Sequence, residues 1–138
     1  MKLIVDTCVW SLALRSRNKN LLGASEQKLV SELRDIIEDE RAVMLGLIRQ
    51  EILSGIRGKT EFARIQNLLE PFLDEPIETP DYIEAARLFN LCQDHGVQCG
   101  LVDILICAVA VRSHFGILTS DQGLNRCIEA LRAEGLNL

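Results

Sequence analysis

Three short apolar runs, set apart by longer segments with helical periodicity, constrain the fold of this chain more than any other feature. They lie at residues 2–5, 42–45 and 115–119, and they are apolar on both faces rather than alternating. Strands of this kind are typical of a parallel sheet that helices cover on both sides. We therefore predict an α/β fold in three layers, with a short, mostly parallel central sheet flanked by helices.

Apolar residues spaced three or four apart predict helices between and after these runs. The expected helices cover residues 7–15, 25–40, 48–56, 62–69, 80–95, 101–114 and 124–131. Residues 16–24 are predicted to form a loop, and Ile77 is predicted to lie in a further short strand. The helix over residues 101–114 is apolar almost all round, so we expect it to be buried.

Length and composition narrow the class of protein. The 138 residues fit a single domain spanning residues 1–138. The longest apolar run, residues 104–111, is far shorter than the roughly 20 residues of a transmembrane helix, and Asp6 comes too early for a secretory signal. The five cysteines are irregularly spaced, which favours buried reduced thiols over a disulfide framework. We expect a soluble cytoplasmic protein with no membrane association.

Four acidic residues stand where a parallel sheet would present its functional edge. Asp6 follows the first apolar run and Asp121 follows the third, while Glu51 and Asp103 lie in apolar surroundings near helix starts. Each one alone is explained equally well as a helix cap or an exposed ion-pair partner. Gathered within about 6 Å, however, carboxylates repel by roughly 3 kcal/mol per pair. Protons or a divalent cation must then compensate, and oxygen ligands favour Mg²⁺ or Mn²⁺ over zinc.

At these acids the sequence resembles PIN-domain ribonucleases, and within that family the VapC-type toxins of type II toxin–antitoxin modules. The resemblance covers nearly the whole chain and rests on four segments in the family's order, at residues 5–10, 50–56, 102–110 and 118–121. It implies a PIN-like fold and a Mg²⁺-dependent endoribonuclease. It also implies a metal site formed by Asp6, Asp103 and Asp121, with Glu51 binding through water or helping to take a proton. Cys8 stands where the family often has Asn.

Further side chains near the acids have two interpretations each. The hydroxyls of Thr7, Thr119 and Ser120 could orient a ligand or a phosphate, or only cap helices.

Basic side chains near the N-terminus raise a similar choice. The net charge of -5 argues against a nonspecific nucleic-acid binder, although residues 1–20 hold four basic side chains and one acidic one. In that stretch Arg15, Arg17 and Lys19 could hold an RNA backbone, or belong to a solvated loop.

The resemblance also implies partners. Toxins of this family are held by a small antitoxin whose tail often places a basic side chain in the acidic pocket, and an excess of carboxylates gives a physical reason for such a partner. We expect a complex with a cognate antitoxin, an RNA substrate, and a homodimer through helix faces near the N-terminal half.

Two other functions and one other site remain open. The chain could be a noncatalytic interaction domain, or a phosphoacceptor-like α/β domain in which Asp6 is phosphorylated. A phosphatase of that kind needs a second Asp two residues after Asp6, where this chain has Cys8. Finally, Cys92, His95 and Cys99 have a spacing that could give three zinc ligands, but the sequence offers no fourth.

Overall fold

A short parallel sheet forms the centre of the molecule. The computed structural model describes residues 1–15 and 21–138. Its strands are β1 (Leu3–Val5), β2 (Ala42–Val43) and β3 (Gly116–Leu118), in the order β2-β1-β3. Leu3 pairs with Ala42 on one side and Gly116 on the other, and both described ladders are parallel. The prediction of a short, mostly parallel sheet is confirmed, although each strand is shorter than its apolar run.

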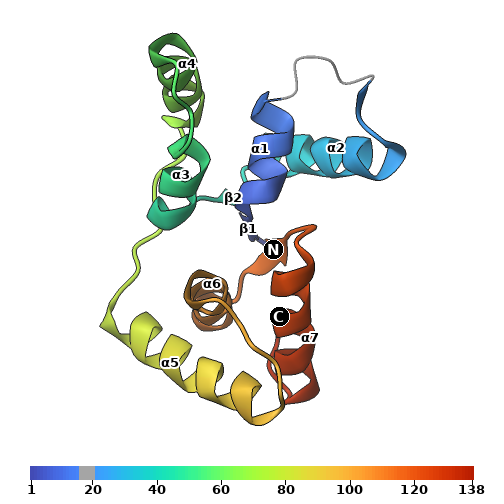
Figure 1. Ribbon diagram of the computed structural model, residues 1–138, viewed down its shortest axis with the longest axis vertical. Helices are drawn as coiled ribbons and strands as arrows, with labels where there is room; N and C mark the ends of the chain where they lie inside the picture. Colours follow the sequence, from blue (N-terminus) through green and yellow to red (C-terminus); the bar gives the residue numbers. More distant parts are fainter. Residues whose placement is uncertain (16–20) are drawn as a thin grey trace.

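Helices make up most of the rest of the described chain. They are α1 (Thr7–Arg15), α2 (Ala24–Glu38), α3 (Gly46–Leu53), α4 (Lys59–Leu69), α5 (Thr79–Asp94), α6 (Leu101–Ser113) and α7 (Gln122–Ala133). In Figure 1, α1 to α4 lie to one side of the strands and α5 to α7 to the other. This is the predicted α/β arrangement, with every expected helix present and its ends shifted by a few residues. None of the described helices is long and apolar enough to cross a membrane.

One predicted strand is absent and one predicted loop is only partly described. Ile77 lies outside any strand, and the nearest pairing is an isolated parallel bridge between Met44 and Asp74. A single apolar residue between prolines is therefore a weak strand signal here. Of the expected loop at 16–24, residues 16–20 lie outside the described part, and α2 begins at Ala24.

The helix α6 is buried because it serves two cores at once. Ile106, Val109 and Ala110 join the cluster formed with β1, β2 and the helices α1 to α4. Ile104 and Cys107 face the other way, into the cluster formed with α5 and α7. An all-round apolar sequence is what such a position requires, so the predicted burial of this helix is confirmed. Its first turn is thereby held firmly beside the strand ends.

An ion pair between the buried Asp81 carboxylate and the exposed Arg112 side chain fixes α5 against α6. Asp81 is 0% exposed, accepts from the Glu78 amide over 2.9 Å, and receives two hydrogen bonds from the Arg112 guanidinium. Burial alone opposes ionisation, but the bonds from Arg112 and Glu78 outweigh it and hold the pKa of Asp81 below its usual range. The ion pair therefore ties the start of α5 to the end of α6.

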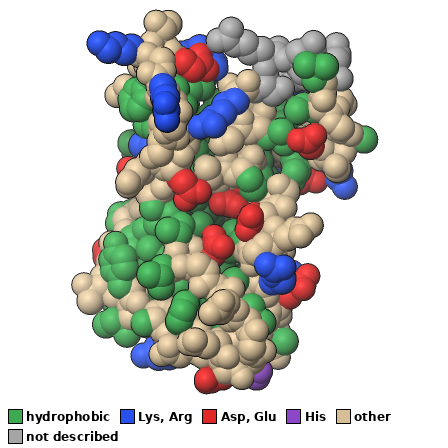
Figure 2. Space-filling view, viewed as in Figure 1, with side chains coloured by type: hydrophobic (Ala, Val, Ile, Leu, Met, Phe, Trp, Pro, Cys, Tyr) green, Lys and Arg blue, Asp and Glu red, His purple; other side chains and the backbone are tan. Residues whose placement is uncertain are grey.

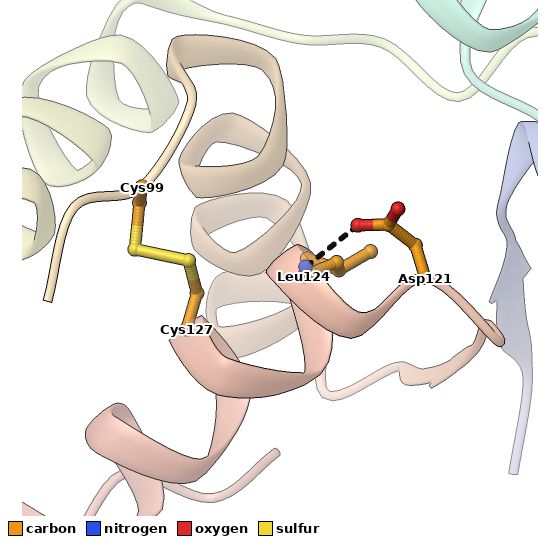
Figure 3. Close-up of a disulfide and its surroundings, with 4 residues drawn as sticks. All are labelled: Cys99, Asp121, Leu124 and Cys127. Atoms are coloured by element: carbon orange, nitrogen blue, oxygen red, sulfur yellow. Dashed lines mark hydrogen bonds between the residues drawn. A yellow bond between two sulfur atoms is a disulfide. The ribbon is translucent and has the colours of Figure 1, made fainter.

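The expectation that the cysteines are reduced thiols is wrong for one pair. Cys99, in the segment before α6, is joined by a disulfide to Cys127 on α7, with their Cα atoms 6.0 Å apart (Figure 3). Cys8, Cys92 and Cys107 are free. The fold brings together two cysteines 28 positions apart, which irregular spacing along the chain does not reveal.

The alternative zinc site is not formed in the described structure. Cys99 is in the disulfide, and His95 lies against the Glu134 carboxylate.

Candidate active site

Asp6 is the acid of the four whose carboxylate accepts the most hydrogen bonds among the described residues. It follows β1 directly and its amide donates to the Leu118 carbonyl, which extends the pairing of β1 with β3 by one step. Its Oδ1 accepts from the Thr7 amide at 2.8 Å, and its Oδ2 accepts from the Thr119 hydroxyl at 2.7 Å and from the Cys8 thiol at 3.4 Å. The residue is only 8% exposed. Donors from two strand ends therefore fix both oxygens of a nearly buried carboxylate.

Asp121 sits at the N-cap of α7, as the capping interpretation predicted. Its Oδ2 accepts from the Leu124 amide at 2.8 Å (Figure 3). Its own amide donates to the Thr119 hydroxyl at 3.0 Å. The single hydroxyl of Thr119 thus links the Asp6 carboxylate to the backbone of Asp121. Capping and membership of an acidic site are compatible here, because the start of α7 lies at the same sheet edge as Asp6.

Asp103 shows that the acids share one electrostatic neighbourhood. It lies half-buried in the first turn of α6. Burial raises the pKa of the Asp103 carboxyl, and the negative charges of Asp121, Asp6 and Glu51 raise it further. Glu51 itself is exposed on α3. Four elements distant in the sequence therefore bring carboxylates close enough to repel one another, and Figure 2 shows acidic side chains gathered at the middle of this face.

The cluster is open rather than a preformed cage. Within residues 1–15 and 21–138, no group of three or more His, Cys, Asp or Glu side chains is arranged so that it could hold a metal ion. The donors are nevertheless hard oxygens, and among the described residues none of the four acids forms an ion pair with a basic side chain. The donor chemistry fits a hard divalent cation, although the described side chains are not arranged as a finished binding site for one.

The three candidate hydroxyls differ in their surroundings. Thr119 is bonded to the acids as described, but the Thr7 hydroxyl is buried without a partner among the described atoms. The Ser120 hydroxyl is exposed and contacts the Cys8 sulfur at 3.5 Å. Of the three, only Thr119 directly positions an acidic side chain in this structure.

Cys8 is a residue of the site that the sequence did not identify. Its sulfur donates to Asp6, lies 3.6 Å from the Thr119 hydroxyl and accepts from Ser120. The available signal was its position, two residues after Asp6, where the similar family often has Asn. A thiol is a weaker donor than an amide, so Cys8 supports Asp6 less strongly than an Asn would.

The basic residues proposed for a nucleic-acid backbone are only partly described. Arg15, at the end of α1, donates to the Ile52 carbonyl on α3 at 2.9 Å. It thereby ties α1 to the helix that carries Glu51. Arg17 and Lys19 lie outside the described residues.

The structure is thus an α/β domain with an acidic cluster at the carboxyl edge of a parallel sheet. Known proteins are similar to the chain in both sequence and fold. A model of the PIN domain family matches residues 3–128, so the chain belongs to the PIN domain family, whose members are generally nucleases. A search of curated proteins finds no match. Among solved structures, the crystal structure of FitAcB from Neisseria gonorrhoeae matches with a TM-score of 0.73. The two are 19% identical over 92% of this chain and 93% of that chain, which shows a shared fold.

Proposed function

We propose that the chain is a Mg²⁺- or Mn²⁺-dependent endoribonuclease toxin of the VapC type. The observation that carries this proposal is the raised pKa of Asp103, caused by burial and by three other acids that converge on it from separate elements. Folding holds these charges together although they repel one another, which a structural role alone does not require. A hard dication would remove the repulsion, and membership of a nuclease family supplies the reaction class.

The residues of the chain have separate roles in the proposed reaction. Asp6, Asp103 and Asp121 would hold the cation, with Asp6 kept in position by Thr119 and the Thr7 amide. When bound, a divalent cation supplies charge stabilisation at the phosphate and makes a water molecule more acidic. Glu51 is exposed, so it can reach a water and accept its proton, or bind the cation through water.

The proposed substrate is RNA cut within the strand. We propose that Arg15 contacts the phosphate backbone, and that Arg17 and Lys19, which lie outside the described residues, have the same role. Arg15 also makes one backbone hydrogen bond to Ile52, which leaves its remaining donors to meet a phosphate.

The proposed partners and location complete this function. A cognate antitoxin would place a basic side chain among the acids, where it would replace the cation electrostatically. We also propose a homodimer, and action in the cytoplasm, where the RNA substrate is found.

The test is cleavage of RNA by the purified chain with Mg²⁺, with and without a chelator. Asp6→Asn should abolish cleavage, because the substitution removes one charge from the cluster while keeping the size of the side chain. Asp94→Asn is the matched control, since Asp94 is an exposed acid near the end of α5. Equal cleavage by the wild type and Asp6→Asn, or cleavage unaffected by the chelator, would contradict the proposal.

A noncatalytic interaction domain is the second candidate. The absence of a preformed metal cage among the described residues favours it, because acids that only bind a basic peptide need no such cage. Calorimetry separates the two functions: no Mn²⁺ binding in the low millimolar range would favour the interaction domain.

The phosphoacceptor alternative has less support. Both oxygens of Asp6 already accept hydrogen bonds and the residue is nearly buried. Labelling of Asp6 by acetyl phosphate would favour the phosphoacceptor function.

A further inference from the structure

The disulfide joins the segment that leads into α6 to the helix α7. Cys99 lies two residues before the start of α6, and Cys127 lies in the second turn of α7. Asp103 follows Cys99 by four residues, and Asp121 precedes Cys127 by six. Figure 3 shows that Asp121 caps the same helix that carries Cys127. The crosslink therefore ties together the two helix starts that present Asp103 and Asp121.

The crosslink acts against a repulsion between these two acids. Burial raises the pKa of Asp103 most, and among the neighbouring charges the Asp121 carboxylate has the largest effect. When the cysteines are reduced, the apolar cluster that α6 and α7 share has to resist this repulsion without the covalent bond. The redox state of the two cysteines therefore bears on the geometry of the acidic cluster.

The two cysteines differ in their access to solvent. Cys99 is 7% exposed and lies outside the helices and strands, whereas Cys127 is 1% exposed and lies within a helix. Thiol–disulfide exchange passes through a mixed disulfide and depends on access to the sulfur that reacts. Cys99 is therefore the residue that meets a small thiol or disulfide from solution, and Cys127 is the residue that resolves the mixed disulfide.

Two other thiols in the same apolar cluster do not compete for this reaction. Cys92 is 1% exposed and Cys107 is fully buried. Burial raises the pKa of both thiols, that of Cys107 to about 12. Because the thiolate and not the thiol attacks a disulfide, these two cysteines stay reduced. The chemistry within this cluster is confined to the pair formed by Cys99 and Cys127.

We propose that Cys99 and Cys127 form a reversible redox site whose oxidised form strengthens dication binding by the acidic cluster. The oxidant is a low-molecular-weight disulfide such as oxidised glutathione. The Cys99 thiolate attacks one sulfur of the oxidant, which forms a mixed disulfide and releases one small thiolate. The Cys127 thiolate then attacks the Cys99 sulfur and releases the second. Two protein thiols are oxidised to one disulfide, one small disulfide is reduced to two thiols, and the released thiolates take up the two protons that the cysteines lose.

Preorganisation links the redox site to the dication. The oxidised chain already holds the helix starts of Asp103 and Asp121 together, so a dication that binds both acids meets a smaller cost of ordering them. By linkage, a dication that binds the oxidised form more tightly must favour oxidation of the thiols by the same factor. This link rests on the proposed dication site, whereas the exchange chemistry does not. The proposed action in the cytoplasm agrees with a reversible pair, because disulfides there are usually transient.

The first measurement is the redox equilibrium of the metal-free chain in mixtures of reduced and oxidised glutathione. Alkylation of the free thiols after unfolding, followed by the mass of the intact chain, counts them. We expect three thiols in the oxidised chain, five in the reduced chain, and the same equilibrium from either direction. Cys99→Ser should keep four thiols in every mixture. A disulfide that glutathione cannot open, or one that never forms with oxidised glutathione, would overturn the redox site.

The second measurement repeats this equilibrium with saturating Mn²⁺. We expect that opening the disulfide then needs about a 10-fold greater excess of reduced glutathione, and that Asp103→Asn abolishes this shift. A chain that binds Mn²⁺ in calorimetry but shows no shift would contradict the link between the two sites and leave the proposed function standing. A chain that binds no Mn²⁺ would contradict the proposed dication site and the link together, while the metal-free equilibrium still decides the redox site.

Discussion

Replacing Thr119 by Val tests how the sheet edge holds Asp6. Valine keeps the branched shape of threonine but removes the hydroxyl that donates to Asp6 Oδ2 at 2.7 Å and accepts from the Asp121 amide at 3.0 Å. Asp6 is 8% exposed, so water replaces the lost donor poorly. A hydrogen bond to a charged group contributes about 1.5–3 kcal/mol. We therefore expect Thr119→Val to lower the free energy of unfolding by about 2 kcal/mol.

This loss is large enough to measure by thermal denaturation without divalent cations. An unfolding entropy of roughly 2.1 cal/mol/K per residue over 138 residues converts about 2 kcal/mol into a fall in Tm of about 7 °C. Thr119→Ser keeps the hydroxyl and should lose much less. Ser120→Ala removes an exposed hydroxyl whose only described contact is with Cys8, and should change little. If Thr119→Val melts with the wild type, the hydroxyl does not hold Asp6 and the description of the site is wrong.

Three further predictions concern stability. Arg112→Met leaves the buried Asp81 carboxylate unpaired and should cost about 3–5 kcal/mol in urea unfolding near neutral pH. The pKa of Asp81 is lowered in the folded chain, so the wild type should lose the stabilisation from the ion pair as the pH falls below 3.8, the ordinary pKa of Asp. The unfolding free energies of the wild type and Arg112→Met should therefore converge in acid and not in base. Reducing the Cys99–Cys127 disulfide, which closes a loop of 28 positions, should lower the unfolding free energy by about 3–4 kcal/mol, and Cys127→Ser should show no response to reductant. Asp103→Asn should make the metal-free chain more stable in thermal denaturation, because it removes a half-buried charge that faces three others, whereas a lower Tm would contradict the repulsion.

The parts of the fold that follow from local pattern were predictable. The strand at residues 2–5 and the helix at 101–114 are specified by their own apolar residues, and their burial follows from the number of layers that cover them. The positions of Asp6 and Asp121 just after strands at the sheet edge were predictable for the same reason. In a parallel sheet, the residue after a strand lies at the functional edge whatever the rest of the chain does.

The parts that depend on tertiary approach were not predictable. The Cys99–Cys127 pairing depends on how α7 packs against the segment before α6, and spacing does not encode this. The contacts of Cys8 depend on the pairing of β1 with β3, which brings Thr119 beside it. The bond from Arg15 to Ile52 likewise follows from the packing of α1 on α3. The sequence pattern indicated the candidate acids, but not the side chains that contact them, such as Cys8 and Thr119 beside Asp6.

The central claim is that four carboxylates from separate elements form one site that a hard dication neutralises. Calorimetric titration of the purified chain with Mn²⁺, compared between the wild type and Asp103→Asn, tests it most directly. The account predicts that the wild type binds Mn²⁺ in the millimolar range or tighter, and that Asp103→Asn binds at least about 10-fold more weakly. Equal binding by both proteins, or no heat with either, would contradict it.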